Sequence, residues 1–487
     1  MIPVTGDRHP PELVIERALI GNDWITLPAS IAVVDPATGA VIGHVPDCGA
    51  AETRAAIDAA EKAGGAWRAR PAPDRAALLR AWHAKILAKA EDLARLLTAE
   101  QGKPLGEARD EIAYAASFIG WFAGEAERIG GYEVPAPGSD RRILVARQPV
   151  GVTAAITPWN FPAAMVTRKL APALAAGCTV VLKPSELTPF TALALARLAI
   201  DTGIPHGVIN VVTGAPAAIG AELMASDRVR KLSFTGSTPV GRTLMRQAAD
   251  TVKRLSLELG GNAPFIVFDD ADLDAAVAGA MASKFRNAGQ TCVCANRFLV
   301  QSGIHDRFVA KLGTAVRALK VGDGFGPAVT TGPLIHGDAG KKVRGHLSDA
   351  LARGATLAAR ALIDDEAGAW VAPAIVTDAT ATMRVANEET FGPLAAVFRF
   401  DSEAEAIDLA NNGPAGLAAY FYTGDIARAW RVGDLLEYGM IGVNAGGVSL
   451  ASAPFGGMKQ SGLGREGGRE GIDEYLETKA LHWGALG

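Results

Sequence analysis

A cysteine in a glycine-containing loop is the first feature of this sequence that could carry covalent chemistry. Cys292 lies in the run Gly289-Gln290-Thr291-Cys292-Val293-Cys294, which follows a predicted helix. A cysteine acts as a nucleophile when a nearby base or a lowered pKa produces its thiolate. A metal site needs further ligands at suitable spacing. Cys48, Cys178 and the scattered histidines do not supply them, so we expect a nucleophile and no bound metal.

Two other polar residues each lie at the end of a predicted strand. Glu258 ends an apolar strand before a Gly-Gly turn, where a carboxylate facing a crevice can act as a general base. Asn160 lies between two prolines in Thr157-Pro158-Trp159-Asn160-Phe161-Pro162, and its amide could donate to a developing oxyanion. Two simpler interpretations stay open. Local amides could satisfy Glu258, and the Asn160 side chain could stabilise a rigid turn.

A glycine-rich turn could bind a phosphate. The run 236–243, Gly-Ser-Thr-Pro-Val-Gly-Arg-Thr, follows a strand and opens a helix, whose N-terminal amides and Ser237 hydroxyl could meet a phosphate. An ordinary glycine-capped turn is the alternative. The run differs from a P-loop because Arg242 replaces the lysine, and no acidic Mg²⁺ partner is evident, so nucleotide hydrolysis is a weak hypothesis. The usual G-x-G-x-x-G dinucleotide fingerprint is absent.

Strands and helices must position these residues, and their alternation predicts two α/β units. Helices are expected at 76–99, capped by Asp74, and at 105–128. Alternation from 150 to 258 and again from 264 to about 421 indicates parallel sheets covered by helices. Expected strands are 152–157, 180–183, 208–213, 231–235 and 264–268, and expected helices are 189–200, one near 217, one after 236, and 272–286. Such sheets bind ligands beyond the carboxyl ends of their strands.

A hairpin-like segment and the C-terminal tail fall outside both units. A strand is expected at 142–150, and the tail ends in another strand-like run. Exposed strand edges are usually covered, and a second subunit would cover these. We therefore predict a nucleotide-binding domain from 1–129 and 150–258, a catalytic domain from 259–470, and an oligomerisation element from 130–149 and 471–487.

Composition excludes several classes of protein. The chain has 487 residues and a net charge of −4, without the basic excess of a nucleic-acid-binding surface. Its longest apolar run, 170–182, is shorter than the roughly 20 residues that span a membrane. Residues 1–8 lack a signal-peptide pattern, and four cysteines are too few for a disulfide framework. We expect a cytoplasmic protein that binds neither membrane nor nucleic acid.

Taken together, the motifs closely resemble the aldehyde dehydrogenase superfamily and, within it, the succinate-semialdehyde dehydrogenases. The resemblance covers nearly the whole chain. Its most specific marks, in the family's order, are Ile-Thr-Pro-Trp-Asn-Phe-Pro (156–162), Leu-Glu-Leu-Gly-Gly-Asn (257–262), Phe-Arg-Asn-Ala-Gly-Gln-Thr-Cys (285–292), Glu-Glu-Thr-Phe-Gly-Pro (388–393) and Pro-Phe-Gly-Gly-Met-Lys-Gln-Ser-Gly (454–462). It implies that family's fold, with two parallel-sheet α/β domains and a β-hairpin and tail that form a homodimer or homotetramer.

The resemblance also implies a catalytic mechanism. Cys292 is expected to attack the aldehyde carbon and form a thiohemiacetal, whose oxyanion is held by Asn160 and the Cys292 backbone N–H. Hydride then passes to a nicotinamide and leaves a thioester, which a water molecule activated by Glu258 hydrolyses to the acid. The presence of all three residues argues against a non-catalytic relative with a structural or binding role.

The cofactor residues are carried over in the same way. NAD is favoured because the Glu186 carboxylate would accept from the ribose hydroxyls and repel a 2′-phosphate. NADP is possible because Lys183 and Ser185 would tolerate that phosphate. The residues that match the family's cofactor contacts are Trp159, Lys183, Ser185, Glu186, Gly236, Ser237, Glu389 and Phe391.

The expected substrate is a small aldehyde that carries a carboxylate, namely succinate semialdehyde. Arg168, Arg286 and Ser449 match the positions with which the subgroup binds that carboxylate, and a planar guanidinium suits it. Arg168 could instead bind a cofactor phosphate or a backbone carbonyl. Gly447 and Ser452 depart from the subgroup's pattern, so glutarate semialdehyde or a broad range of aldehydes, including aromatic ones, are the alternatives.

Two further matches carry open interpretations. Lys169 and Glu477 match a pair that either relays protons or forms a structural ion pair. Cys294 is either a packed thiol or a redox partner that forms a disulfide with Cys292.

Overall fold

The computed structural model describes residues 8–484. Residues 1–7, in which no signal-peptide pattern was found, lie outside this range. Residues 485–487, the end of the predicted tail, lie outside it as well. Within the described range, no helix is both long and apolar enough to cross a membrane.

Seven strands from residues 18–258 and one later strand form a sheet of eight strands, whose order is β2-β1-β9-β8-β7-β10-β11-β21. The five inner strands run parallel, as predicted, whereas β1, β2 and β21 are antiparallel additions at the edges. The strands are β1 (Ala18–Ile20), β2 (Asp23–Ile25), β7 (Val152–Ile156), β8 (Thr179–Lys183), β9 (Ile209–Val211), β10 (Val229–Thr235), β11 (Arg254–Glu258) and β21 (Gly462–Leu463).

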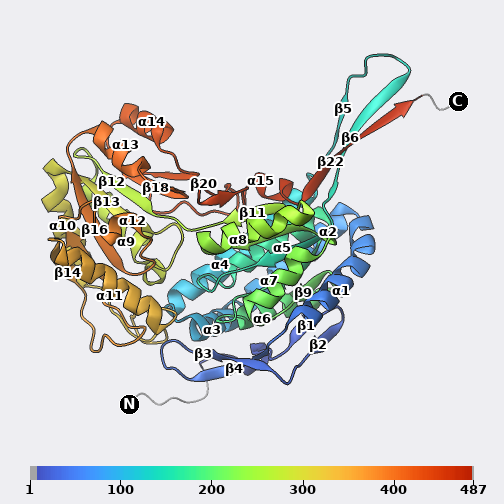
Figure 1. The fold of residues 1–487 in the computed structure, drawn as a ribbon, viewed down its shortest axis with the longest axis horizontal. Helices are drawn as coiled ribbons and strands as arrows, with labels where there is room; N and C mark the ends of the chain where they lie inside the picture. Colours follow the sequence, from blue (N-terminus) through green and yellow to red (C-terminus); the bar gives the residue numbers. More distant parts are fainter. Residues whose placement is uncertain (1–7, 485–487) are drawn as a thin grey trace.

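Helices cover both faces of this sheet (Figure 1). They are α1 (Ala50–Ala69), α2 (Ala72–Ala88), α3 (Ala90–Gln101), α4 (Leu105–Ala126), α5 (Ala164–Ala176), α6 (Phe190–Ile200), α7 (Pro216–Ala225) and α8 (Thr238–Ala248), with short 3₁₀ turns η1 (Pro11–Leu13) and η2 (Ala249–Thr251). A separate hairpin pairs β3 (Ser30–Val34) with β4 (Val41–Pro46).

The single helix predicted for 76–99 is wrong, because the segment forms two helices. Lys89 leaves the helical conformation at φ −109° and ψ 18°, and its Nζ pairs with Asp92 at 3.0 Å. Glu91 and Asp92 provide acidic side chains in the first turn of α3, where they favour the positive end of a new helix. Asp74, expected to be the cap, lies inside the first turn of α2.

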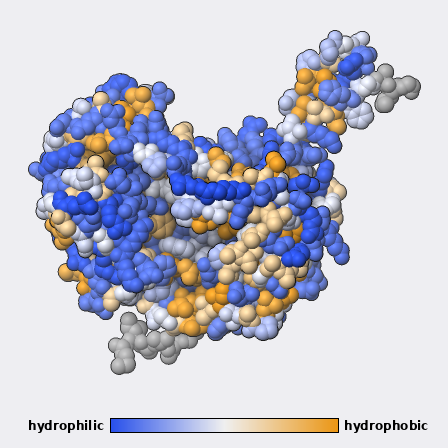
Figure 2. All heavy atoms as spheres, viewed as in Figure 1, coloured by the Kyte–Doolittle hydropathy of each residue, from blue (hydrophilic) through white to orange (hydrophobic). Residues whose placement is uncertain are grey.

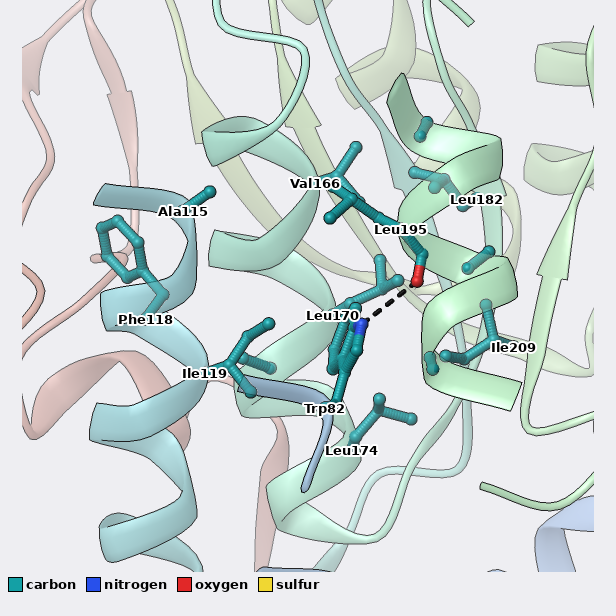
Figure 3. Close-up of a cluster of buried hydrophobic side chains, with 14 of the residues drawn as sticks. Trp82, Ala115, Phe118, Ile119, Val166, Leu170, Leu174, Leu182, Leu195 and Ile209 are labelled. Atoms are coloured by element: carbon teal, nitrogen blue, oxygen red, sulfur yellow. Dashed lines mark hydrogen bonds between the residues drawn. The ribbon is translucent and has the colours of Figure 1, made fainter. Parts of the chain in front are cut away.

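Trp82 anchors the packing of four helices in this half (Figure 3). The indole is fully buried, and its Nε1 donates a hydrogen bond to the backbone carbonyl of Leu195 in α6 at 3.1 Å. Apolar side chains of α4 and α5 surround it, including Ile119, Leu170 and Leu174. The helices therefore pack on one another through the predicted buried run 170–182 as well as on the sheet.

The second half forms a sheet of seven strands, whose order is β14-β15-β16-β13-β12-β18-β19. All neighbours are parallel except β14 and β15. The strands are β12 (Ala263–Val267), β13 (Ala295–Gln301), β14 (Thr356–Arg360), β15 (Ala374–Thr377), β16 (Leu394–Phe400), β18 (Ala418–Tyr422) and β19 (Met440–Val443). The helices are α9 (Leu273–Lys284), η3 (Arg286–Gly289), α10 (Ser302–Arg317), α11 (Gly337–Ala352), α12 (Arg384–Asn387), α13 (Glu403–Asn411) and α14 (Ile426–Leu435).

A three-stranded arm projects from the molecule (Figure 1). It contains β5 (Tyr132–Val134), β6 (Arg141–Pro149) and the C-terminal β22 (Leu476–Gly484), which is antiparallel to β6 along its whole length. Figure 2 shows apolar residues on the arm, and its exposed apolar side chains include Tyr132, Leu144 and Trp483. The remaining elements are β17 (Ala415–Gly416) paired with β20 (Met458–Lys459), and α15 (Glu470–Asp473).

These observations confirm the predicted fold class of two largely parallel α/β units with an additional β element. The chain also returns from the second unit to the first at β21, which pairs with β11. The domain boundaries given above stay a prediction.

We expect Trp82→Phe to lower the free energy of unfolding by about 2 kcal/mol, because it removes a buried hydrogen bond and part of a packed ring. Equilibrium urea denaturation measures this change. Trp430→Phe is the matched control, because Trp430 is 76% exposed and should change stability by less than about 0.5 kcal/mol. Equal stability of the two variants would contradict the role of Trp82.

Candidate active site

The parallel order of the first sheet creates a natural crevice. From β7 the chain proceeds outward through β8 and β9 on one side, and then returns to place β10 and β11 on the other side. The strand order therefore reverses between β7 and β10, where the loops after the two strands diverge and leave room for a ligand. The loop after β7 carries Trp159 and Asn160, and the turn after β10 carries Gly236 and Ser237.

A cavity of about 370 Å³ opens at this crevice between the two sheets. It is lined from the first sheet by the loops after β7, β10 and β11, and from the second half by the cysteine loop, α11 and the segment before β16. It brings together eight residues selected from the sequence, namely Trp159, Asn160, Gly236, Ser237, Glu258, Cys292, Glu389 and Phe391.

Unusual backbone geometry holds the cysteine loop in place. Asn287, Ala288 and Gly289 have left-handed φ values of 52°, 52° and 74° in succession. A Cβ at Gly289 would lie 2.3 Å from the carbonyl oxygen of Gly392, so only glycine fits there. A Cβ at Gly261 would likewise lie 2.4 Å from the carbonyl oxygen of Cys292. Two glycines from separate motifs, Gly289 and Gly261, therefore allow the cysteine loop to lie close to the segment before β16 and to the turn after β11.

Glu258 is a buried carboxylate without a partner. It is 3% exposed, and neither of its carboxylate oxygens accepts a hydrogen bond from any residue in the range 8–484. Burial raises the pKa of the Glu258 carboxyl well above its usual range, and the nearby charge of Glu466 raises it further. Local amides therefore do not satisfy Glu258, and its oxygens remain available to accept a proton.

Asn160 presents an oriented amide. The side chain is 5% exposed, and its Nδ2 donates to the carbonyl of Gln290 at 2.9 Å. An amide nitrogen has two hydrogens, so the second one is left for another acceptor. The backbone N–H of Cys292 also donates no hydrogen bond to any acceptor in the described part of the chain. Two free donors therefore lie in the loops that meet at the cavity.

The Cys292 thiol is protonated at neutral pH in this conformation. Burial raises the pKa of Cys292 to about 12, and the carboxylates of Glu258 and Glu389 contribute, while Arg168 opposes them. Cys294 forms no disulfide and is buried, with its sulfur 3.5 Å from the Lys284 ammonium. The Cys292 thiol therefore needs a base to become a strong nucleophile.

The predicted cofactor residues fall into two groups. Lys183 is the last residue of β8, and Ser185 and Glu186 follow it; none of the three lines the cavity, and the Lys183 ammonium pairs with the Glu186 carboxylate at 2.6 Å. Ser237 is the N-cap of α8, yet its hydroxyl accepts no capping hydrogen bond, so hydroxyl and helix terminus are both free. Burial raises the pKa of Glu389 to about 7.

Two aromatic rings line the same cavity. Trp159 and Phe391 meet edge to face, with ring centroids 5.6 Å apart. Phe391 has a left-handed φ of 54°, which is strained for an aromatic residue. Together with Gly236, Ser237 and the Glu389 carboxylate, the rings give one cleft a free helix N-terminus, hydrogen-bond acceptors and an apolar surface.

The predicted substrate residues Arg286 and Ser449 lie together, at a distinct place. They line a small cavity of about 60 Å³, and Arg286 also lines a neighbouring cavity of about 620 Å³. The Arg286 guanidinium lies 5.4 Å from the Phe161 ring and forms no hydrogen bond or ion pair with the residues that the structure describes. It is therefore a cation available to an incoming anion.

Arg168, in contrast, already has an anionic partner. Its guanidinium lies 3.0 Å from a carboxylate oxygen of Glu466 and 3.8 Å from the centre of the Phe455 ring. The same Glu466 carboxylate accepts a hydrogen bond from the buried Lys169 ammonium. An added substrate carboxylate would have to share Arg168 with Glu466.

The predicted pairing of Lys169 with Glu477 is wrong. Glu477 lies in β22 and pairs with Arg254 at 3.0 Å. Glu466 reaches Lys169 because it closely follows β21, which pairs with β11 at the edge of the first sheet. A sequence distance of 297 residues separates Lys169 from Glu466, so spacing alone gave no signal for this pair.

Tyr114 of α4 is a residue of this region that the sequence did not indicate. Its hydroxyl is buried and forms no hydrogen bond of normal geometry, although Ser449 lies beside it. Burial raises the pKa of Tyr114, while the charges of Arg168 and Arg286 oppose that shift. Its position on a helix face is typical of an ordinary core aromatic, so nothing in the sequence distinguishes it.

The sequence of this chain is similar to those of known aldehyde dehydrogenases. A model of the aldehyde dehydrogenase family matches residues 24–481. The NADP(+) succinate-semialdehyde dehydrogenase GabD of Escherichia coli strain K12 is 58% identical over 468 residues, covering 96% of this chain and 97% of that protein. Glutarate-semialdehyde dehydrogenase of Pseudomonas putida is 57% identical over 473 residues, covering 96% and 98%.

A solved structure is similarly close. The crystal structure of succinate-semialdehyde dehydrogenase from Burkholderia pseudomallei superimposes with a TM-score of 0.97. The two sequences are 56% identical, and the match covers 99% of this chain and 100% of the other.

The raised pKa of Cys292 predicts a steep pH dependence of alkylation. In the protein without cofactor, we expect the rate of labelling by iodoacetamide to rise about tenfold per pH unit between about pH 7 and 9, since only the thiolate reacts. Mass spectrometry of the labelled peptide measures the rate. Cys292→Ser should abolish this labelling, because the other three cysteines are buried. A plateau near neutral pH would contradict the prediction.

Proposed function

Since this chain belongs to the aldehyde dehydrogenase family, and is therefore an oxidoreductase that acts on aldehydes, we propose that it oxidises succinate semialdehyde to succinate, with NAD⁺ favoured as hydride acceptor. The observation that carries the proposal is one cavity lined by a cysteine, an unpartnered buried carboxylate and an oriented amide. The similarity to succinate-semialdehyde dehydrogenases supports the choice of substrate.

In the proposed first step the Cys292 sulfur attacks the aldehyde carbon and forms a thiohemiacetal. The thiol proton needs an acceptor because burial holds the pKa of Cys292 at about 12, and Glu258 offers two free carboxylate oxygens in the same cavity. The negative charge that develops on the aldehyde oxygen would accept hydrogen bonds from the free N–H of Asn160 and the backbone N–H of Cys292. A preorganised donor of this kind lowers the barrier by roughly 3 kcal/mol.

The residues of the cleft fit a nicotinamide dinucleotide. The free N-terminus of α8 and the uncapped Ser237 hydroxyl suit the pyrophosphate, and Glu389 suits a ribose hydroxyl. When bound, the cofactor supplies the hydride acceptor that converts the thiohemiacetal to a thioester. Trp159 and Phe391 would border the nicotinamide and exclude water from it.

The Glu186 carboxylate supports a preference for NAD⁺ over NADP⁺. A carboxylate can accept hydrogen bonds from two ribose hydroxyls, whereas it repels a 2′-phosphate. Lys183 pairs with Glu186 and partly neutralises this repulsion, so NADP⁺ is a weaker second cofactor. The relative from Escherichia coli is named for NADP(+).

In the proposed last step Glu258 takes a proton from a water molecule, which then hydrolyses the thioester. The raised pKa of Glu258 makes it a stronger base than an exposed carboxylate. The neighbouring Lys169, Arg168 and Glu466 form a buried charged cluster whose field acts on Glu258. Hydrolysis releases the acid and leaves the free Cys292 thiol, so the enzyme returns to its starting state.

Arg286 and Ser449 are the proposed site for the carboxylate at the far end of the substrate. Arg286 has no partner of its own among residues 8–484, and its planar guanidinium can bind both oxygens of a carboxylate. Arg168 would contribute less, since Glu466 already occupies it. The tyrosine hydroxyl of Tyr114 lies beside Ser449 and offers a further donor.

Glutarate semialdehyde is a second candidate substrate, and one observation favours it. Gly447 lines both cavities beside Arg286, and a Cβ built on it would contact nothing within 4 Å. This space would admit one more methylene group. The similarity to a glutarate-semialdehyde dehydrogenase supports the same alternative.

The projecting arm supports assembly as a homodimer or homotetramer. Its strands leave an open edge at β5 and expose apolar side chains that a second copy of the chain would cover. A cytoplasmic location agrees with four free cysteines in the described residues.

The first experiment is a comparison of substrates and cofactors. Purified protein is mixed with succinate semialdehyde, glutarate semialdehyde or benzaldehyde, each with NAD⁺ or NADP⁺, and the absorbance of the reduced cofactor is followed. We expect the highest kcat/KM with succinate semialdehyde and NAD⁺, and no turnover by Cys292→Ala. A higher value for benzaldehyde would overturn the assigned substrate class, and no turnover with any aldehyde would overturn the proposed activity.

Arg286→Gln tests the carboxylate site separately from the chemistry. The variant loses a hydrogen-bonded charge pair, so kcat/KM for succinate semialdehyde should fall roughly 10- to 100-fold, which corresponds to about 1.5–3 kcal/mol. Butanal has the same carbon chain without the carboxylate and is the control, whose kcat/KM should change less than about twofold. Equal losses with both aldehydes would show that Arg286 does not bind the carboxylate.

A further inference from the structure

Lys103 is a buried lysine with no place in the mechanism described so far. It lies between α3 and α4 in Gly102-Lys103-Pro104 and is 2% exposed. Its ammonium donates to Glu111 at 2.5 Å and to the backbone carbonyl of Asn160 at 2.9 Å, and it lies 4.1 Å from the centre of the Phe161 ring. Burying an ammonium is costly unless such partners compensate it, so these contacts are needed to hold the Lys103 side chain in the interior.

Glu111 extends the contact to the next helix. One of its carboxylate oxygens accepts the hydrogen bond from Lys103, and the other accepts from the backbone N–H groups of Ala163 and Ala164 at 2.9 and 3.2 Å. These amides lie at the start of α5. The Lys103–Glu111 pair therefore fixes the loop at Asn160 and again where the loop becomes a helix.

The carbonyl of Asn160 is also bound from the opposite side. Asn287, in the strained turn before Cys292, donates its Nδ2 to the same carbonyl at 2.9 Å. The Asn160 side chain donates in turn to the carbonyl of Gln290. Of these three hydrogen bonds, the one from Lys103 joins Asn160 to another segment of the first half of the chain. The other two join Asn160 to the cysteine loop.

We propose that Lys103 is a positioning residue that, by holding the Asn160 carbonyl, aims the free N–H of the Asn160 amide at the site where the oxyanion forms. The inference rests on the proposed function, in which Asn160 donates to that oxyanion. A donor acts on the transition state only when it is preorganised, and a displacement of about 1 Å is enough to lose much of its effect. Lys103 would not touch the substrate itself.

The test uses a variant that removes the contact without leaving a buried charge. Lys103→Met alone would strand the Glu111 carboxylate, so it is combined with Glu111→Gln, whose amide oxygen still accepts from Ala163 and Ala164. Glu111→Gln alone is the matched control: the Lys103 ammonium loses its counter-ion but can still donate to the Asn160 carbonyl, so this variant separates the effect of the lost charge pair from that of the lost contact. Lys103→Gln with Glu111→Gln is a second pair, in which the two amides can bond one another.

We expect Lys103→Met/Glu111→Gln to lower kcat for succinate semialdehyde about tenfold, with KM changed less than about threefold and the fraction of reactive Cys292 unchanged. Glu111→Gln should keep kcat within about twofold. The same pair of changes in an Asn160→Ala background should lower kcat by less than about twofold, because the group that Lys103 positions is then absent.

The outcomes separate this inference from the proposed function. If Asn160→Ala retains kcat, the oxyanion role of Asn160 is wrong. If Asn160→Ala loses activity but both double variants, Lys103→Met/Glu111→Gln and Lys103→Gln/Glu111→Gln, retain kcat, only the role of Lys103 is wrong. An equal fall of kcat in both backgrounds, or an equal fall in Glu111→Gln, would mean that Lys103 serves stability alone.

Discussion

The cleft depends on one close approach between two stretches of backbone. Gly261, in the turn that joins the two sheets, lies so near the carbonyl of Cys292 that no side chain fits between them. This turn follows Glu258 at the end of β11 and precedes β12, which pairs with the strand that follows the cysteine loop. The chain connection therefore brings base and thiol to one cavity, and a larger residue at Gly261 would separate the two halves.

Burial then sets the electrostatics of that cavity. It raises the pKa of Glu258, of Glu389 and of Cys292, so each favours its neutral form more than it would in water. Beneath them, Glu466 joins Lys169 and Arg168 in a charged cluster that is hydrogen-bonded and closed to solvent. Glu258, the group assigned to proton transfer, accepts no hydrogen bond from residues 8–484, whereas the Lys169 ammonium donates to both Thr235 and Glu466.

Much of this arrangement could be predicted from the sequence, because its signals are local. Alternating strands and helices gave the parallel order, and short motifs selected Cys292, Glu258 and Asn160, which the fold brings to one cavity. The errors and omissions involve contacts between distant segments. Glu466 reaches Lys169 across 297 residues, and Lys103 reaches Asn160 across 57 residues. A lysine in a short loop gives no sign that it is buried, and the break at Lys89 contains neither glycine nor proline to mark it.

The C-terminal strand has a consequence for the order in which the molecule is built. All nine residues of β22 pair with β6, and β21, only a short distance earlier, completes an edge of the first sheet. Both partners, β6 and β11, leave the ribosome hundreds of residues before the strands that complete them. The arm surface and the buried contact between Lys169 and Glu466 therefore form only after residues about 300 or more positions downstream of their partners have been made. A nascent chain that stops before residue 462 lacks both strands, so β6 and β11 each keep an open edge until β22 and β21 have been made.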